Sequence, residues 1–381
     1  MIAAKSPCFW AAKLYPRWLL NYYVLPNDNA VRASSKAKKE HANMAGEFGL
    51  LASSESQPGK VGPLVSVIVT SLNRPEFLRT ACASILGGNY RNIEVFICDD
   101  ASDNQEARDA ARALASSDER IEVIQNGVRL GQFRSIAQAM ARMRGKYFAI
   151  LNDDDTWEVS FLAKLVPPLE RDRELVASFC DHWLIDADGQ IDLAATDRLT
   201  AQCQRADLAP GRHEDSGNLA FGLSAFPTVV ASVFRTSRPD LEAYLNARMD
   251  TIGFYDLWLQ VCLLGDRAPV WFEPERCSSY RLHTGQLSAQ RSNALARAKA
   301  WILEEALNGG RFAKSEQSIL HQLARSHHAV GVNYLRQGRP RLARNYLWRA
   351  CLIAPRWRAV AGLVLTLGVW PIRVRERLVR S

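Results

Sequence analysis

The sequence predicts an α/β fold, with a doubly wound sheet flanked by helices and an α-helical appendage at its C-terminal end. Two observations predict it. Short apolar runs of the buried-strand type alternate with segments whose apolar residues recur at helical spacing, and the connections between them are short. Beyond about residue 290 only the helical pattern continues.

The strands and helices are expected in strict alternation from residue 64 onward. The first strand is Val65–Thr70, and Pro75 suits the first turn of the helix that follows, Pro75–Leu86. The next elements are strands at Glu94–Cys98, Ile121–Ile124 and Tyr147–Leu151, and helices at Gln105–Leu114, Ile136–Arg144 and Phe161–Glu170. Later come a buried segment Val176–Ile185, a strand Val229–Phe234 and a helix Phe254–Leu264. Residues 188–222 lack a clear period and are interpreted as loops over the active-site edge.

The chain length of 381 residues allows a full catalytic domain and a smaller appendage. Residues 1–62 are interpreted as an amphipathic N-terminal segment and a polar linker, residues 63–290 as the α/β domain and residues 291–381 as the helical region. No segment has the roughly 20 uninterrupted apolar residues of a membrane-spanning helix. Phe9–Leu25 is broken by charges and a proline, and the apolar run Ala359–Trp370 is only twelve residues long.

Cysteine usage and charge indicate where the protein works. The eight cysteines are scattered and mostly lie in apolar runs, as buried thiols in a reducing compartment do, which predicts a cytoplasmic protein. Residues 336–381 carry eleven arginines and one acid, a local net charge of +10 within a total of +8. Because the remainder is slightly acidic, a nucleic-acid partner is disfavoured, whereas the basic tail is compatible with peripheral contact with the inner face of the membrane.

Two strands are followed by acidic clusters at the edge of the sheet where ligands bind in such folds. Asn152-Asp153-Asp154-Asp155 follows the fourth strand, and adjacent carboxylates of this kind favour a divalent cation, Mg²⁺ or Mn²⁺. Asp99 and Asp100 follow the second strand, where a carboxylate can accept hydrogen bonds from a nucleobase or a ribose. Each cluster also has a plainer interpretation, as a solvated turn or as a cap of the next helix.

The segment Thr70-Ser71-Leu72-Asn73-Arg74 closes the first strand. Its small and polar residues leave room for a base, and Arg74 has the geometry to bind phosphate through two parallel hydrogen bonds. The plainer interpretation is an ordinary polar turn.

Together these segments resemble the family 2 glycosyltransferases over roughly residues 64–290. The resemblance rests on their order and spacing, and it continues with Asn126–Gly131, Leu151–Trp157, Tyr255–Trp258 and Tyr280–His283. It implies a GT-A fold, an inverting mechanism, and a nucleotide-sugar donor whose sugar passes to a carbohydrate or lipid-linked acceptor. Cell-surface polysaccharide or glycan assembly is the setting that the family suggests.

The resemblance also implies roles for individual residues. Asp256, at the start of a helix, is the expected catalytic base, and a metal ion is expected on Asp154, Asp155 and His283. The nucleotide-binding residues that it implies are Thr70, Asn73, Arg74, Asp99, Asp100 and Asp153. Considered singly, Asp256 is also explained as an acid favoured by the helix dipole, and His283 as a structural histidine.

Two positions depart from the family pattern. Asn152 stands where the family has the first acid of its metal motif, which removes one charge from the site. The run Gln132–Ile136 lacks the asparagine that often follows the glycine-bearing loop. A non-catalytic carbohydrate- or nucleotide-binding protein that retains the fold is therefore the alternative function.

Residues 324–357 resemble one tetratricopeptide repeat. The residues at its signature offsets are Gly331, Tyr334, Gly338, Ala343, Ala350 and Pro355. A single repeat cannot bury its own apolar face, so it is expected to pack on its neighbours, with a docking surface for a partner as the alternative.

Overall fold

The computed structural model describes residues 62–227, 229–236, 240–245, 254–283, 292–354 and 357–366. The N-terminal segment expected within residues 1–61, Pro355 of the expected repeat and the tail beyond Thr366 lie outside these residues. Within them, no helix has both the length and the apolar character needed to cross a membrane.

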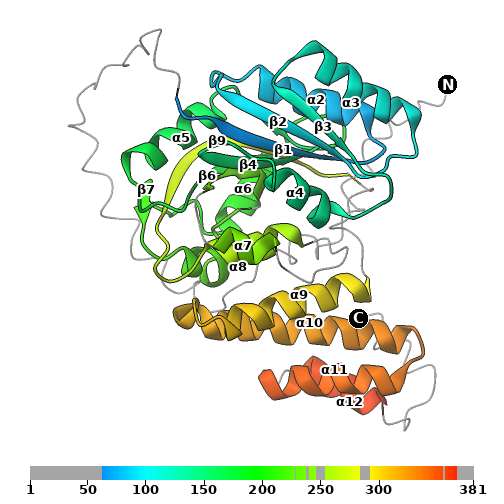
Figure 1. Ribbon diagram of the computed structural model, residues 1–381. Helices are drawn as coiled ribbons and strands as arrows, with labels where there is room; N and C mark the ends of the chain where they lie inside the picture. The colour runs from blue at the N-terminus through cyan, green and yellow to red at the C-terminus, as the bar shows by residue number, and fades with distance from the viewer. Residues whose placement is uncertain are drawn as a thin grey trace, which may run out of the picture. The chain divides into compact units, whose positions relative to one another are not determined.

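A mixed sheet forms the centre of the described part of the chain (Figure 1). Its strands are β1 (Val65–Ser71), β2 (Ile93–Asp99), β3 (Ile121–Gln125), β4 (Tyr147–Asn152), β5 (Thr156–Trp157), β6 (Ala177–Ile185), β7 (Gly211–His213), β8 (Ser232–Arg235) and β9 (Val270–Arg281). Their order is β3-β2-β1-β4-β8-β6-β9-β5, and β7 pairs with β9. The strands β1 to β4 are parallel, whereas β8 runs antiparallel to both β4 and β6.

Helices cover the sheet and continue beyond it. They are α2 (Pro75–Leu86), α3 (Gln105–Ser117), α4 (Gln132–Met140), α5 (Phe161–Arg171), α6 (Leu193–Gln202), α7 (Asp240–Leu245), α8 (Tyr255–Leu263), α9 (Asn293–Asn308), α10 (Glu316–Arg336), α11 (Pro340–Ile353) and α12 (Trp357–Thr366). In Figure 1, α2 and α3 lie on one face of the parallel strands and α4 on the other. The predicted fold class is therefore confirmed.

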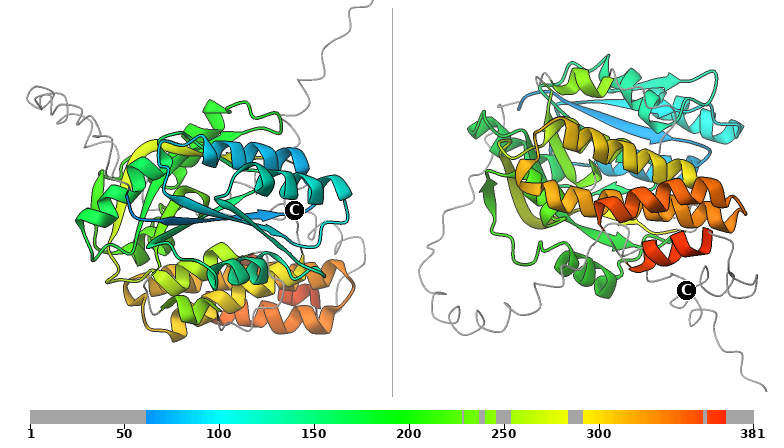
Figure 2. Two further views of the ribbon diagram at one scale, coloured as in Figure 1. Left: turned by 45° about the horizontal axis from the view of Figure 1, so that its top comes forward. Right: turned by 90° about the horizontal axis from the view of Figure 1, so that it is seen from below.

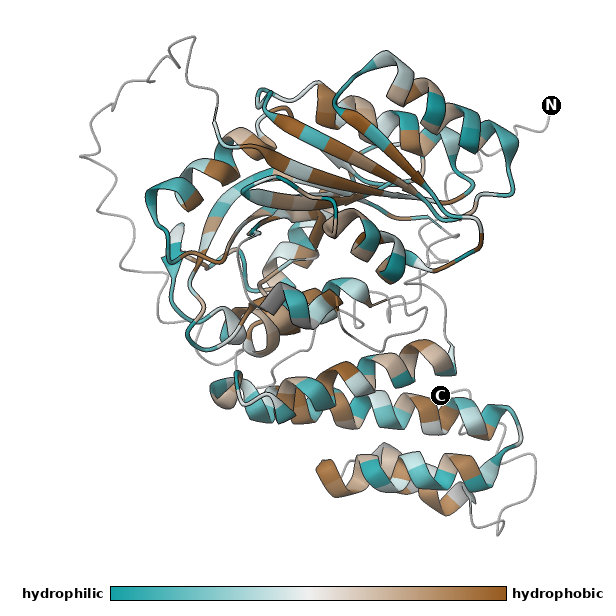
Figure 3. Cartoon of the chain, in the orientation of Figure 1, coloured by the Kyte–Doolittle hydropathy of each residue, from teal (hydrophilic) through white to brown (hydrophobic). Residues whose placement is uncertain are grey.

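The parallel strands form the core because both of their faces are covered. Every residue of β1 and β2 is buried, and Figure 3 shows these strands as mostly hydrophobic. The register aligns Thr70 of β1 with Asn152 of β4, and Ser71 of β1 with Asp99 of β2. The three strands therefore end side by side, and the polar residues that follow them meet at one edge.

The structure departs from the expected elements in three regions. Helix α4 begins at Gln132 and not at Ile136, directly after Gly131, whose φ of 83° ends the preceding turn. The region 188–222, expected as loops, contains α6, β7 and a short π-helix at Asn218–Gly222. The long strand β9, which no sequence pattern predicted, pairs in parallel with β6 across a bulge.

The C-terminal helices pack on the α/β domain through aromatic contacts. The Trp258 ring on α8 lies against that of Trp301 on α9, with centroids 5.1 Å apart, and Phe221 contacts Phe312 at 5.0 Å. Helices α10, α11 and α12 then lie against one another, as Figure 2 shows from below. A Cβ atom at Gly331 of α10 would lie 2.6 Å from Leu347 Cγ of α11, so glycine permits this close approach.

Candidate active site

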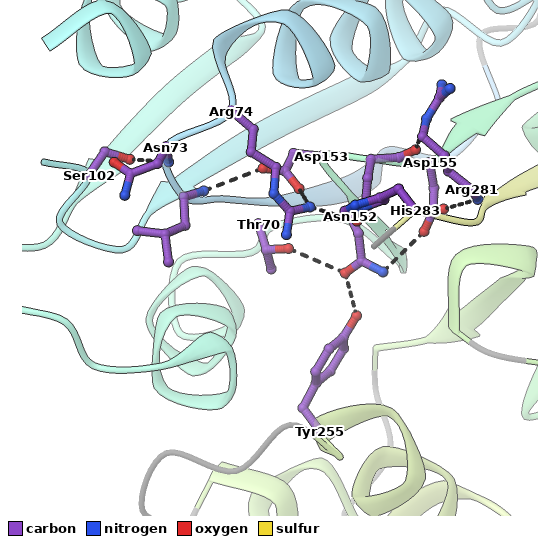
Figure 4. Close-up of polar contacts among 12 residues, drawn as sticks. Thr70, Asn73, Arg74, Ser102, Asn152, Asp153, Asp155, Tyr255, Arg281 and His283 are labelled. Atoms are coloured by element: carbon purple, nitrogen blue, oxygen red, sulfur yellow. Dashed lines mark hydrogen bonds and ion pairs between the residues drawn. The ribbon is translucent and has the colours of Figure 1, made fainter. Parts of the chain in front are cut away.

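The acidic segment after β4 is neutralised by a basic side chain from the loop after β1. Arg74 Nη1 lies 2.6 Å from Asp154 Oδ2 and 3.2 Å from Asp153 Oδ1 (Figure 4). His283, after β9, places its Nε2 3.0 Å from the same Asp154 oxygen. Residues from two segments that are distant in the sequence thus converge on Asp154.

The pKa values of these carboxyl groups diverge because their partners differ. Burial alone would raise the pKa of Asp154, but the contacts with His283 and Arg74 outweigh it, and the pKa is lowered. Burial, together with the charge of Asp154, raises the pKa of Asp153 to about 7. Asp154 is therefore the anionic centre of the cluster.

Asp155 is fully buried and bonded to the protein through both oxygens. Its Oδ1 accepts a hydrogen bond from the backbone N–H of Arg281, 2.9 Å away, and its Oδ2 accepts one from Asn152 Nδ2 at 3.1 Å. Burial raises the pKa of Asp155 well above its usual range, and the charge of Asp154 adds to this. These hydrogen bonds connect the segment after β4 to the end of β9.

Asn152 joins the acidic segment to α8. Its Oδ1 accepts hydrogen bonds from the Tyr255 hydroxyl at 2.7 Å and from Thr70 Oγ1 at 3.3 Å, while its Nδ2 donates to Asp155 (Figure 4). Burial raises the pKa of Tyr255, so its hydroxyl stays protonated and able to donate. With both hydrogen-bonding ends engaged, Asn152 acts here as a connector.

The end of β2 is held by a second network. Asp99 Oδ1 accepts from the backbone N–H and the hydroxyl of Ser102, and Ser102 Oγ in turn accepts from the Asn73 backbone N–H at 2.9 Å. Asn73 has a φ of 59°, a left-handed conformation that asparagine tolerates. The loops after β1 and β2 are therefore joined beside the acidic cluster.

Asp100 holds the glycine-bearing loop before α4. Its carboxylate accepts hydrogen bonds from the backbone N–H groups of Leu130 at 2.7 Å and Gly131 at 2.9 Å, and from Asn126 Nδ2 and Ser135 Oγ. These bonds explain why α4 begins at Gln132. The predicted contacts of Asp99 and Asp100 with a nucleoside stay a prediction.

Asp256 is the second residue of α8, next to Tyr255. Burial raises the pKa of its carboxyl group, and a hydrogen bond from the Leu257 backbone N–H and the charge of Lys299 on α9 oppose this rise. The Tyr255–Asn152 hydrogen bond ties this turn of α8 to the acidic cluster. The catalytic role of Asp256 remains a prediction.

The donor atoms for a metal ion are present on Asp154 and His283. A carboxylate oxygen and an imidazole nitrogen face each other there, a combination that suits a divalent cation such as Mn²⁺. Among the residues that the structure describes, no group of three or more His, Cys, Asp or Glu side chains is arranged as a ready-made metal site. The guanidinium of Arg74 supplies the positive charge on Asp154 instead.

The chain is similar to known proteins over this same region. Residues 66–192 match the family described as glycosyl transferase family 2. A protein of Bacillus subtilis (strain 168) named as the glycosyltransferase EpsE is 35% identical over 199 residues, which are 51% of this chain and 70% of EpsE. The chain belongs to glycosyl transferase family 2. It is therefore an enzyme of glycosyl transfer, as the sequence predicted.

The chain is also similar to other glycosyltransferases. WfaP of Escherichia coli, a UDP-Glc:alpha-D-GlcNAc-diphosphoundecaprenol beta-1,3-glucosyltransferase, is 24% identical over 234 residues, covering 61% of this chain and 83% of WfaP. The chain spans 68%, 45% and 50% of the length of three further glycosyltransferases, from Haemophilus influenzae, Methanocaldococcus jannaschii and Bacillus subtilis.

Superposition on solved structures confirms the predicted GT-A fold. Staphylococcus aureus TarS (residues 1–349) in complex with UDP-GlcNAc superposes with a TM-score of 0.59 at 12% identity, over 79% of this chain and 88% of that one. The mannosyltransferase PcManGT from Pyrobaculum calidifontis, in complex with GDP-Man and Mn²⁺, gives 0.50 at 19% identity, over 85% and 87%.

Sequence reasoning missed three residues that shape this site: Tyr255, Arg281 and Ser102. Tyr255 and Arg281 lie within the family-like segments Tyr255–Trp258 and Tyr280–His283, so their positions carried a signal. The sequence carried no signal for their hydrogen-bond partners, because Tyr255 and Asn152 are 103 residues apart and Arg281 and Asp155 are 126 residues apart.

Proposed function

We propose that this chain transfers a sugar from a nucleotide-diphosphate sugar to an acceptor hydroxyl, with inversion at the anomeric carbon. The observation that supports this most is the convergence of Arg74 and His283 on Asp154, with the first turn of α8 tied to the same segment. A basic group, an acid and a candidate base are thereby held at one edge of the sheet. That is where ligands bind in open α/β sheets.

The donor is proposed to lie along the ends of β1, β2 and β4. Thr70, Asn73, Arg74, Asp99, Asp100 and Asp153 are the proposed nucleotide-binding residues. Arg74 supports this best, because its guanidinium already binds two carboxylates and is suited to a diphosphate. The relatives carry UDP-sugars or GDP-Man, so a nucleoside diphosphate sugar is proposed without choosing its base.

Asp154 and His283 are proposed to hold a divalent cation, Mg²⁺ or Mn²⁺, with Asp155 in support. When bound, the cation supplies positive charge that stabilises a departing diphosphate. The Mn²⁺ in the PcManGT complex is in keeping with this proposal. The full burial of Asp155 suits a residue that orients the segment carrying Asp154.

Asp256 is the proposed catalytic base. Its carboxylate would take the proton of the acceptor hydroxyl while that oxygen attacks the anomeric carbon and the bond to the diphosphate oxygen breaks. Burial raises the pKa of this group, which makes its carboxylate a stronger base. Lys299 on α9 helps to keep it ionised.

The acceptor is proposed to be a carbohydrate or a lipid-linked sugar in the assembly of a cell-surface polysaccharide. Support comes from WfaP, whose name specifies a diphosphoundecaprenol-linked acceptor. We further propose a cytoplasmic protein in peripheral contact with the inner face of the membrane, in which the basic tail takes part.

Donor turnover tests the proposed base. We expect Asp256→Asn to lower the rate of UDP-glucose or GDP-mannose turnover with Mn²⁺ by about 10²–10⁴-fold, while leaving binding of that nucleotide sugar nearly unchanged. Glu106→Gln is the matched control, because Glu106 is an exposed acid in the first turn of α3. If Asp256→Asn turned over the donor at the wild-type rate, Asp256 would not be the base.

The same assay distinguishes the proposed enzyme from the alternative function, a non-catalytic binding protein. Asn152 favours that alternative, because an amide at this position removes one negative charge from the acidic segment. Binding of a nucleotide sugar with no turnover by the wild type, in the presence of a range of acceptor sugars, would support it.

A further inference from the structure

Helix α11 exposes large apolar side chains on the face that does not pack. Its inner face is filled by Ala343, Leu347 and Ala350, which are buried against the neighbouring helices. On the outer side, 58% of Trp348 and 68% of Leu352 are exposed. These two residues are one turn apart and therefore neighbours on the helix surface.

The exposed apolar groups concentrate at this end of the described chain. Half of the large hydrophobic residues that are exposed in the described part of the molecule lie on α11 and α12: Leu342, Trp348, Leu352, Val360 and Val364. Among them, Trp348 and Leu352 are adjacent on one helix face, and adjacent exposed apolar groups are typical of interaction sites.

The stretch of sequence that carries this face has charged residues of one sign only, although Glu304 of α9 lies near enough to Arg349 to interact with its charge. From Gln317 to Thr366 the sequence contains eight arginines and neither aspartate nor glutamate. Arg339 and Arg341 are exposed at the start of α11, and Arg349 is exposed beside Trp348. Any partner of this face must be negatively charged and must offer an apolar environment for the side chains of Trp348 and Leu352.

We infer that the outer face of α11 is a docking surface for a bilayer rich in anionic phospholipids. Tryptophan and leucine enter the interface between headgroups and acyl chains, and arginines around them bind lipid phosphates. An acidic protein would satisfy the charge, but the absence of any acid on this stretch of 50 residues fits a continuous anionic surface better. The described residues contain no helix that crosses a membrane, so the contact is peripheral.

This inference does not depend on the chemistry proposed for the acidic cluster. It assigns membrane contact to a folded helix of the described structure, separately from the tail. A lipid-borne acceptor would be brought to the same membrane, although the docking surface can be tested without knowing that acceptor.

Vesicle flotation with the full-length protein tests the inference. The probes are vesicles of phosphatidylcholine alone and of phosphatidylcholine with about one third phosphatidylglycerol, an anionic composition. We expect the wild type to float with the anionic vesicles only. The double variant Trp348→Ser/Leu352→Ser should bind them roughly tenfold more weakly or worse, because it removes the groups that enter the interface.

Two further variants make the result specific. Ile191→Ser/Leu193→Ser removes exposed apolar groups (52% and 56% exposed) from another part of the surface and should float like the wild type. Arg339→Gln/Arg341→Gln should weaken binding to anionic vesicles. Circular dichroism and thermal unfolding of each variant establish that it is folded.

Three outcomes would overturn the inference. They are no flotation of the wild type with anionic vesicles, flotation of a folded Trp348→Ser/Leu352→Ser variant equal to the wild type, and a dimer in solution that this variant abolishes without any vesicle binding. The last outcome would assign the face to a second copy of the chain. Donor turnover of the Trp348→Ser/Leu352→Ser and Arg339→Gln/Arg341→Gln variants in solution should be unchanged, which separates this surface from the proposed active site.

Discussion

At the scale of single residues, Asn152 is the side chain that sets the geometry of the candidate site. Its amide oxygen accepts from Tyr255 and Thr70, and its amide nitrogen donates to Asp155. A carboxylate at this position could not donate to Asp155. The departure of this residue from the family pattern therefore has a physical reason in the structure.

Replacing Asn152 by aspartate should destabilise the protein in the absence of divalent metal. Asp155 would lose the hydrogen bond from the amide and would face a second acid in a fully buried position, and we expect the free energy of unfolding to fall by about 2–4 kcal/mol. Urea denaturation in buffer with a chelator measures this. Asn104→Asp is the control, because Asn104 caps α3 and aspartate caps equally well. An unchanged midpoint for Asn152→Asp would show that the amide is not the connector described here.

The sequence predicted which residues gather at this edge of the sheet better than it predicted their hydrogen bonds. Arg74, Asp154 and His283 were each predicted, and the structure brings them together. The engagement of Asp100 by the backbone of Leu130 and Gly131 was not predicted, because it depends on how the ends of two strands line up. The type of each residue can be read directly from the sequence, whereas a hydrogen-bond partner 30 or more residues away cannot.

At the scale of helices and strands, the regular alternation from β1 to β4 was predicted because β1, β2 and β4 are buried along nearly their whole length and are therefore rich in apolar residues. Strand β9 was missed because its side chains mix buried, exposed and charged residues over twelve positions. Its pairing with β6 crosses a bulge, and β7 pairs with its first residues whereas β5 pairs with Ser278 and Ser279 near its end. Tertiary pairing, and not a local pattern, makes this segment a strand.

The packing of α10 on α11 predicts the effect of one added methyl group. Gly331→Ala would place its Cβ 2.6 Å from Leu347 Cγ, a clash that should cost about 1–3 kcal/mol, whereas the helix propensity of alanine returns at most about 1 kcal/mol. We expect a net loss of stability, read as a lower midpoint of thermal unfolding. Gly127→Ala is the matched control, since nothing lies within 4 Å of a Cβ at that position. Equal midpoints for both variants would mean that α10 and α11 do not approach as closely as the structure shows.

At the scale of the described molecule, the C-terminal helices support the helix that carries the candidate base. Helix α8 is held on one side by the Tyr255–Asn152 hydrogen bond and on another by the contact of Trp258 with Trp301 on α9. The same helical region continues into α11, with its exposed Trp348 and its arginines. The C-terminal region thus joins the candidate active site to the proposed membrane contact. Its expected likeness to a tetratricopeptide repeat stays a prediction.

The central claim is that Asp154, with His283 and Arg74, gathers a divalent cation and a nucleotide at one edge of the sheet. Thermal unfolding of the wild type and of Asp154→Asn, with UDP-glucose and GDP-mannose and with or without Mn²⁺, tests it most directly. We expect at least one of these nucleotide sugars to raise the wild-type midpoint, by an amount that grows with Mn²⁺, because ligand binding stabilises the folded state by mass action. The Asp154→Asn variant should lose the part of this midpoint shift that depends on Mn²⁺. Equal, metal-independent shifts in both proteins, or no shift with either nucleotide sugar, would contradict the claim.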